Sequence, residues 1–227
     1  MSKKIIIATP NKRSDLVISH LSSRLGDYEI IRISSKQELN LDDLQMLKPE
    51  IIFFPHWSWI IPEEIHARFK CIIFHMTDLP YGRGGSPLQN LVVLGHKETM
   101  LSALLCVSEL DAGPIYLKRR LSLQGTAEEI LTRASDLMEE MIVEILQNKI
   151  EPIAQEGEPF IFKRRRPEDG NIVRLDRVDK IYDYIRMLDG VGYPPAFIET
   201  EHFRVEFNDA KLTNDAVFAN VKIVERK

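Results

Sequence analysis

The chain has 227 residues, of which 44% are apolar, and this is enough to bury a core and excludes an intrinsically disordered protein. Its 30 basic and 34 acidic side chains give a net charge of −4, which disfavours a protein whose main task is to hold nucleic acid. No apolar run approaches a signal-peptide core or the ~20 residues of a membrane span. Two cysteines, Cys71 and Cys106, lie inside apolar runs, as reduced, buried thiols do. We therefore expect a cytoplasmic protein that does not associate with membranes.

The first third of the chain alternates short apolar runs with helical patterns. Strands are predicted at residues 4–8, 28–33, 51–54 and 71–74, and helices at residues 14–25, 41–47 and 62–69. A long loop rich in Gly and Pro follows residue 74. Such alternation is typical of an α/β fold, and we expect a Rossmann-like, mostly parallel sheet with helices on both faces.

The next segment closes the predicted first domain. Residues 98–107 fit a helix or a strand by periodicity alone, and a strand is favoured because the Asp111–Pro114 turn leads directly into an apolar run at 115–121. Thr126 and Glu129 form a capping box that begins a strong amphipathic helix through residue 148. We expect residues 1–150 to form the catalytic domain.

The composition changes after residue 150. Proline, glycine and the charged run at 163–170 predict an extended connector, followed by a helix at 178–188. Alternating strands are predicted near residues 196–199, 203–207 and 221–224. We therefore expect residues 151–227 to form a connector and a small, β-rich appendage with α+β character, built around a hairpin.

The loop that leaves the strand at 71–74 carries the residues best suited to chemistry. Ligands of parallel α/β sheets bind at the carboxyl ends of the strands, and His75 stands at such an end, where its titration range suits proton transfer. Arg83, between two glycines, can direct a cation at a phosphate or carboxylate. Each residue also has a structural interpretation, because His75 alone could be a loop histidine and Asp111 a turn former.

The combined motifs resemble a known family. His75, Leu79-Pro80, Arg83-Gly84 and Leu110-Asp111-Ala112-Gly113 are similar to the signature of the 10-formyltetrahydrofolate-dependent formyltransferases, which act on methionyl-tRNA, glycinamide ribonucleotide or sugar nucleotides. The connector at 165–170 and the segments at 181–186 and 193–197 resemble the tail of the sugar-nucleotide members. The resemblance extends from about residue 50 to about residue 200.

The resemblance implies a reaction and a set of site residues. A substrate amine attacks the formyl carbon of 10-formyltetrahydrofolate without a metal, while His75 stabilises the developing charge and Asp111 holds the imidazole and helps to take the proton. The cofactor contacts implied are Trp57, Trp59, Ile60, Ser108 and Leu110. The acceptor contacts considered are Thr77, Tyr81, Arg83, Gly84, Arg165, Tyr182 and Tyr193. The tryptophans and tyrosines could instead be ordinary packing residues, and the arginine run a solvated surface.

One position departs from the family signature. The family has an asparagine two residues before the histidine, and here that residue is Ile73. Loss of one donor to a developing oxyanion costs about 10²–10³ in rate. Either His75 and a backbone N–H carry the charge, or Asn90, His56 or Thr77 replaces the amide, or the protein is a slow or inactive relative.

We expect an N-formyltransferase that acts on an amino sugar linked to UDP or dTDP, with pseudaminic-type or other surface polysaccharides as the destination. No nucleic-acid partner is expected, and a homodimer is implied by the family alone. Methionyl-tRNA is the first alternative acceptor, disfavoured by the net charge and the short appendage, and glycinamide ribonucleotide is another. A non-catalytic folate- or nucleotide-binding relative is the alternative that Ile73 motivates.

Overall fold

The computed structural model describes residues 3–10 and 14–226. Its central sheet has the strand order β2-β1-β3-β4-β6-β7. The strands are β1 (Lys3–Ala8), β2 (Tyr28–Ile33), β3 (Ile51–Phe54), β4 (Cys71–His75), β6 (Glu98–Leu105) and β7 (Ile115–Ser122). The flanking helices are α1 (Ser14–Arg24), α2 (Leu41–Leu47), α3 (Glu63–His66), α4 (Pro87–Val93) and α5 (Ala127–Asn148). The predicted α/β class with a mostly parallel sheet is confirmed.

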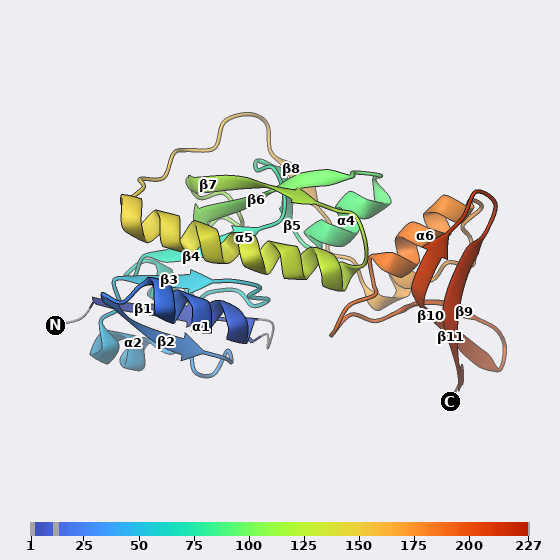
Figure 1. Ribbon diagram of the computed structural model, residues 1–227, viewed down its shortest axis with the longest axis horizontal. Coiled ribbons are helices and arrows are strands. Elements are labelled where there is room, and N and C mark those ends of the chain that lie inside the picture. Colours follow the sequence, from blue (N-terminus) through green and yellow to red (C-terminus); the bar gives the residue numbers. More distant parts are fainter. Residues whose placement is uncertain (1–2, 11–13, 227) are drawn as a thin grey trace. The chain divides into compact units, whose positions relative to one another are not determined.

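The first strands form because their apolar runs are buried on both faces. Ile5, Ile6 and Ile7 have no exposed surface, and β3 is buried along its whole length. Strands β2, β1, β3 and β4 pair in parallel, which requires helices on the faces of the sheet. Helices α1 and α5 supply part of this cover (Figure 1). The side chain of Glu139 in α5 joins them, because it accepts a hydrogen bond from Arg24 and contacts His20.

The sheet reverses direction after β4. Strand β6 pairs antiparallel with β4, so that His75 stands opposite Ser102 and Ile73 opposite Leu104. His75 is the last residue of β4 and therefore lies at the carboxyl edge of the parallel strands. The loop of residues 106–114, which carries Asp111, then joins β6 to β7.

Several elements differ from the predictions. The Gly-rich loop after His75 contains a strand, β5 (Tyr81–Gly84), which pairs with β8 (Phe160–Phe162) in the connector, and the helix α4 follows it. The connector also contains a 3-10 turn at Pro167–Gly170. The helix predicted at 62–69 is limited to Glu63–His66. The strand–turn–strand prediction around Asp111 and the capping box of Thr126 and Glu129 are both present.

The C-terminal part folds around an antiparallel sheet with the order β11-β10-β9 and the helix α6 (Val178–Arg186). Its strands are β9 (Ala196–Glu199), β10 (Phe203–Leu212) and β11 (Val217–Glu225). Helix α6 packs against β10, with Ile185, Ile172 and Ala196 at the centre of a small core (Figure 1). The hairpin of β10 and β11 is longer than predicted.

The chain divides into two compact units that interleave along the sequence. Unit 1 comprises residues 1–83, 100–120 and 132–161, and unit 2 comprises residues 84–99, 121–131 and 162–227. Over the described ranges, no helix combines the length and the apolar character that a membrane span requires.

Candidate active site

His75 is fixed by its place at the end of β4 and by a hydrogen bond on one side of its ring. Its Nε2 lies 2.8 Å from the carbonyl oxygen of Gly82, and only 8% of the residue is exposed. Because a carbonyl oxygen can only accept, Nε2 carries the proton in this bond. Gly82 has a φ of 76°, which glycine adopts without strain, and this turn directs its carbonyl at the histidine. The ring orientation is therefore set by the loop that follows it.

Asp111 faces the other ring nitrogen. Its Oδ2 lies 3.5 Å from His75 Nδ1, and both side chains are more than nine-tenths buried. This separation exceeds that of a good hydrogen bond, and contacts between catalytic groups are often this long before a substrate is bound. Asp111 has a φ of 52°, a left-handed conformation that aspartate tolerates better than most residues. The structure thus brings together the two residues that the sequence singled out.

The turn after Asp111 depends on a close backbone approach. A Cβ on Gly113 would stand 1.8 Å from the carbonyl oxygen of Leu105, so only glycine fits there. Leu105 N in turn donates to the Pro114 carbonyl at 2.9 Å. The Asp-x-Gly spacing therefore has a structural reason, because the glycine lets the two arms of the β6–β7 hairpin close behind the aspartate.

Arg83 is held by protein partners. Its guanidinium donates to Gln155 Oε1 from Nε (3.1 Å) and Nη2 (2.9 Å) and to Glu109 Oε1 from Nη1 (3.0 Å). Gln155 was not among the residues predicted from the sequence. It lies in a segment predicted to be an extended linker, and nothing in its neighbourhood marks it as a partner of Arg83.

The position of the family asparagine is apolar in structure as well as in sequence. Ile73 is half-buried and packs against a cluster that also contacts Trp57 and Cys106. The three side chains considered as replacements are engaged elsewhere. Thr77 donates to the Gly82 carbonyl at 3.3 Å, His56 Nε2 lies 2.8 Å from Ser135 Oγ, and the Asn90 amide donates to the carbonyls of Gly85 and Lys163.

The residues proposed to hold the folate lie in the loops after β3 and β6. Trp59, Ile60 and Leu110 are exposed apolar side chains, with 39%, 74% and 54% of their surface accessible, and Ser108 is also exposed. Trp57 is half-buried, with its ring 4.8 Å from that of Trp59. In the part of the chain that the structure describes, Trp57 Nε1 is a buried donor without a hydrogen-bond partner. The exposed apolar surface of Trp59, Ile60 and Leu110 could contact a flat heterocycle, whereas Trp57 Nε1 is itself covered by protein.

The residues proposed for the acceptor are divided between the two units. Thr77 is fully buried beside Gly82, and Tyr81 stacks on Phe160 with ring centroids 5.3 Å apart. Gly84, Arg165, Tyr182 and Tyr193 belong to unit 2. Arg165 donates to the Asp169 carbonyl at 2.7 Å and lies over the ring of Tyr184, and Tyr182 lies under the Arg186 guanidinium. Arg165 and Tyr182 thus have structural partners within unit 2.

The two cysteines are protonated thiols. Burial raises the pKa of Cys71 well above its ordinary value, and the nearby Cys106 adds to this shift. Burial also raises the pKa of Cys106 to about 11, and the charge of Asp111 contributes. Within residues 3–10 and 14–226, no three His, Cys, Asp or Glu side chains gather in a way that could hold a metal ion.

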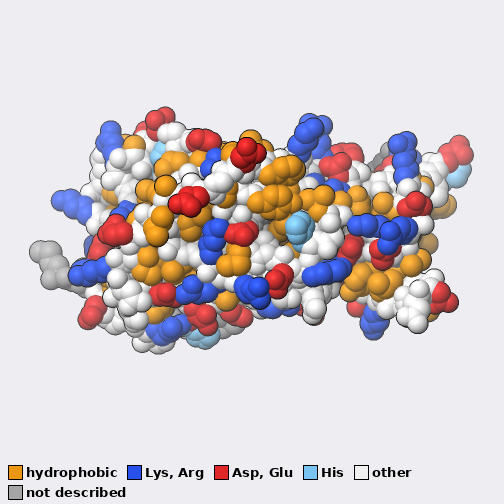
Figure 2. Space-filling view, turned by 90° about the horizontal axis from the view of Figure 1, so that it is seen from above, with side chains coloured by type: hydrophobic (Ala, Val, Ile, Leu, Met, Phe, Trp, Pro, Cys, Tyr) orange, Lys and Arg blue, Asp and Glu red, His pale blue; other side chains and the backbone are white. Residues whose placement is uncertain are grey.

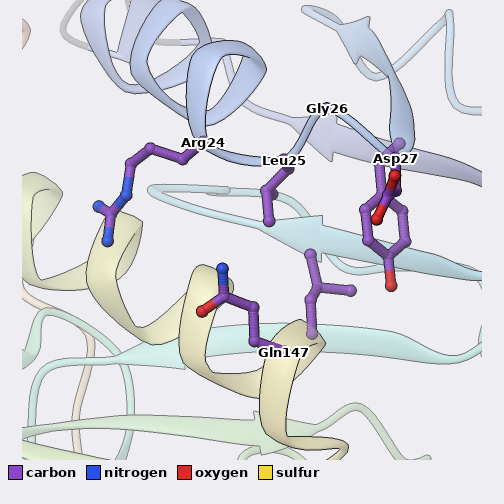
Figure 3. Close-up of a pocket in the computed structure, with 7 residues that line it drawn as sticks. Arg24, Leu25, Gly26, Asp27 and Gln147 are labelled. Atoms are coloured by element: carbon purple, nitrogen blue, oxygen red, sulfur yellow. The ribbon is translucent and has the colours of Figure 1, made fainter.

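A separate pocket has a volume of about 390 Å³ (Figure 3). It is lined by Arg24, Leu25, Gly26, Asp27, Tyr28, Leu146 and Gln147. Tyr28 begins β2 opposite Lys3, so the pocket lies at the amino ends of the parallel strands, whereas His75 lies at the carboxyl end of β4. Because ligands of such sheets bind at the carboxyl ends, the His75–Asp111 pair marks the better candidate site.

Comparisons with known proteins assign the family. Residues 15–146 match the family model described as formyl transferase, and residues 167–224 match the C-terminal domain model of methionyl-tRNA formyltransferase. The chain therefore belongs to the formyl transferase family, whose formyl donor is 10-formyltetrahydrofolate. This confirms the family and the donor implied by the resemblance.

Several individual relatives are methionyl-tRNA formyltransferases. A solved methionyl-tRNA formyltransferase from Clostridium thermocellum is 46% identical, with a TM-score of 0.96, and the match covers 99% of this chain and 100% of that one. The methionyl-tRNA formyltransferase of Campylobacter lari is 27% identical over 79% of this chain, which spans only 60% of that relative's length. A sugar N-formyltransferase from Shewanella is 15% identical with a TM-score of 0.68, covering 88% of this chain and 94% of that one, and shares the fold alone.

These findings contradict the predicted sugar-nucleotide acceptor and the prediction that nucleic acid is not a partner. The error had a physical source. The net charge of −4 sums over the whole chain and says little about a local patch, and Lys163, Arg164 and Arg166 are exposed in one short stretch. Figure 2 shows basic and acidic side chains interspersed on the visible face. The net charge of the chain therefore does not reveal a local group of basic side chains. The short appendage was also misjudged, because it matches the methionyl-tRNA formyltransferase C-terminal model.

Proposed function

We propose that this protein is a methionyl-tRNA formyltransferase, which transfers the formyl group of 10-formyltetrahydrofolate to the α-amino group of methionine esterified to tRNA. The observation that carries the proposal is the 46% identity to a solved methionyl-tRNA formyltransferase over 99% of this chain. The buried His75–Asp111 pair supports a catalytic, rather than a purely binding, role. Because aminoacyl-tRNA is made and used in the cytoplasm, this acceptor also agrees with the predicted cytoplasmic location.

The roles of the two central residues follow from their contacts. When bound, 10-formyltetrahydrofolate supplies the carbonyl carbon that the amine attacks and the oxygen on which negative charge develops. The amine attacks in its neutral form, and Asp111 accepts the proton that the nitrogen loses as its bond to the formyl carbon forms. The bond from this carbon to N10 of the folate breaks, and N10 of the released tetrahydrofolate takes up a proton. In the free protein the Nε2–H of His75 is held by the Gly82 carbonyl. When the donor is bound, this N–H turns to the formyl oxygen and stabilises the developing charge.

The loops after β3 and β6 are proposed to hold the folate. Trp59, Ile60 and Leu110 offer exposed apolar surface beside the half-buried Trp57 ring. In unit 2, the exposed side chains of Lys163, Arg164 and Arg166 are proposed to contact tRNA phosphates. A homodimer remains a prediction from the family.

The decisive experiment is a formylation assay with the purified chain, 10-formyltetrahydrofolate and methionyl-tRNA. We expect formyl-methionine after deacylation, identified by mass spectrometry, and no product when the folate donor is omitted. His75→Ala and Asp111→Asn should each lower the turnover by at least about 10³-fold, because both act at the reacting atoms. Full activity in either variant would contradict the role given to that residue.

A second candidate is a non-catalytic folate-binding relative, which the apolar surroundings of Ile73 favour. Calorimetric titration with tetrahydrofolate separates the two functions. Folate binding without formyl transfer to any aminoacyl-tRNA would support the non-catalytic candidate, whereas transfer would exclude it.

A further inference from the structure

The side-chain amide of Gln155 joins the Asp111–Gly113 turn to Arg83 in β5. Its Nε2 donates to the carbonyl oxygens of Asp111 (2.8 Å) and Gly113 (2.9 Å), and its Oε1 accepts two hydrogen bonds from the Arg83 guanidinium. The orientation of the amide is determined by chemistry, because carbonyls only accept and a guanidinium only donates. Nε2 thus serves the Asp111–Gly113 turn, and Oε1 serves Arg83 in β5.

The segment that carries Gln155 is itself anchored at both ends. We call residues 153–160 the connector strap. Ile153 exchanges two backbone hydrogen bonds with Ile115, at 2.7 and 2.9 Å, immediately after the Asp111–Pro114 turn. At the other end, Phe160 N donates to the Pro80 carbonyl at 3.2 Å, and the Phe160 ring stacks on Tyr81. Gln155 is therefore presented from a fixed backbone and not from a free linker.

One bond from Gln155 falls on a residue with a left-handed backbone conformation. Asp111 has a φ of 52°, a sparsely populated conformation for a residue with a side chain, and such conformations persist when their surroundings over-determine them. A donor at the Asp111 carbonyl restrains the peptide plane that follows this residue, and the second bond, at Gly113, restrains the end of the turn. Together they fix the direction in which the Asp111 carboxylate leaves the backbone.

We propose that Gln155 is a positioning residue for formyl transfer: it holds the Asp111–Gly113 turn so that the carboxylate faces His75, and it ties this turn to Arg83 in β5. The expected loss of rate rests on the proposed function. The positioning of the turn rests only on hydrogen bonds within unit 1. Gln155 touches neither reacting group, so its removal should lower the rate of the chemical step and leave donor binding unchanged.

Two substitutions distinguish the hydrogen bonds that the Gln155 amide donates from the space that its side chain fills. Gln155→Ala removes all of the amide's bonds, whereas Gln155→Glu keeps an acceptor for Arg83 but removes the donor and sets a carboxylate oxygen against two carbonyls. We expect both variants to lose about 10- to 100-fold in kcat, as misplacement of a catalytic group does, with the KM for 10-formyltetrahydrofolate within about twofold of the parent. Glu156→Ala, at an exposed neighbour in the same strap, is the matched control and should change neither value.

A double-mutant cycle tests whether Gln155 acts through Asp111. On an Asp111→Asn background, Gln155→Ala should lower the residual rate by less than about twofold, because the group that it positions has already been removed. An equal drop in rate on both backgrounds would overturn the proposal, and so would full activity of Gln155→Glu, which would limit the role of Gln155 to holding Arg83.

A measurement on the free protein, without donor or acceptor, tests the role of Gln155 separately from the proposed function. The Ala112 amide donates to the Glu109 carbonyl inside the same turn, and its hydrogen exchange can be followed in the free protein. We expect exchange at least about tenfold faster in Gln155→Ala and Gln155→Glu, and unchanged in Glu156→Ala. If the parent protein forms no formyl-methionyl-tRNA, the proposed function fails while this measurement still decides whether Gln155 holds the turn. Unchanged exchange in all three variants would overturn the proposal.

Discussion

Ile73 and His75 point to the same face of β4, because residues two apart in a strand share a face. They are separated by about 6.6 Å along the strand, so an amide at position 73 would project beside the imidazole. We expect Ile73→Asn to raise kcat by at least about tenfold, since the restored donor can reach the developing oxyanion. The same change should lower the free energy of unfolding by about 1–3 kcal/mol, because an amide enters an apolar cluster.

The measurement pairs steady-state kinetics with chemical denaturation. Ile73→Val is the control, since it stays apolar and should leave kcat unchanged while costing about 0.5–1.5 kcal/mol. An unchanged or lower kcat in Ile73→Asn would mean that a donor other than the family amide already serves the site.

The charge of Asp111 should also be detectable at Cys106. Burial raises the pKa of Cys106 to about 11, and the Asp111 carboxylate adds to that shift by disfavouring a neighbouring thiolate. Asp111→Asn removes the negative charge, lowers the pKa of this thiol and increases the thiolate fraction at a given pH. We therefore expect faster alkylation of Cys106 by iodoacetamide at about pH 9. Cys71 is an internal reference, because Asp111 is not among the causes of its raised pKa. Equal acceleration at both cysteines would indicate loosening of the fold instead.

His75 and Asp111 could be predicted because their types and spacing carry the chemistry. Gln155 could not, because its partners lie 72 residues away at Arg83 and 44 at Asp111, and no local pattern encodes such a meeting. Arg165 was considered an anion contact, and yet its guanidinium is shared between the Asp169 carbonyl and the Tyr184 ring. A run of arginines looks uniform in sequence, and only tertiary contacts distinguish its members.

At the scale of elements, the prediction succeeded where local physics decides. The apolar runs of β1 and β3 can only be buried strands, and the Thr126–Glu129 box fixes the start of α5. It failed at β5, which was predicted to be a glycine loop and becomes a strand only because β8, far along the chain, supplies its hydrogen-bond partner. Strand pairing of this kind is non-local and leaves little trace in composition.

The β6–β7 hairpin offers a test of a close approach. A Cβ at Gly113 would stand 1.8 Å from the Leu105 carbonyl oxygen, and backbone atoms cannot move aside cheaply. We expect Gly113→Ala to cost about 3 kcal/mol or more of the free energy of unfolding, measured by urea denaturation. Gly26→Ala is the matched control, because nothing lies within 4 Å of its added Cβ and the change should be close to neutral. A similar, small cost for both would contradict the packing at Gly113.

At the scale of the whole molecule, the net charge of −4 misled because tRNA binding depends on where cations lie. We expect Lys163→Gln combined with Arg164→Gln and Arg166→Gln to raise the KM for methionyl-tRNA. The slope of log K against log salt should also become shallower, by about one for each phosphate that the variant no longer neutralises. The KM for the folate donor should stay the same.

The matched control changes three exposed cations in unit 1, with Lys36→Gln, Arg68→Gln and Lys70→Gln. Both triple variants lower the net charge by three, so a general electrostatic effect would appear equally in each. A larger effect of the first variant on tRNA would assign phosphate contacts to the segment 163–166, and equal effects would remove them from it.

The strand order β2-β1-β3-β4-β6-β7 has a consequence for how the protein is made. After β1 pairs with β2, each later strand of this sheet adds to the same growing edge in the order in which it leaves the ribosome. No strand of this sheet, as the described residues form it, has to insert between two that have already paired, so it can assemble during synthesis, N-terminal part first. In that order of events His75 takes its place when β4 joins the sheet. It meets the Asp111 carboxylate only after the hairpin of β6 and β7 has been added.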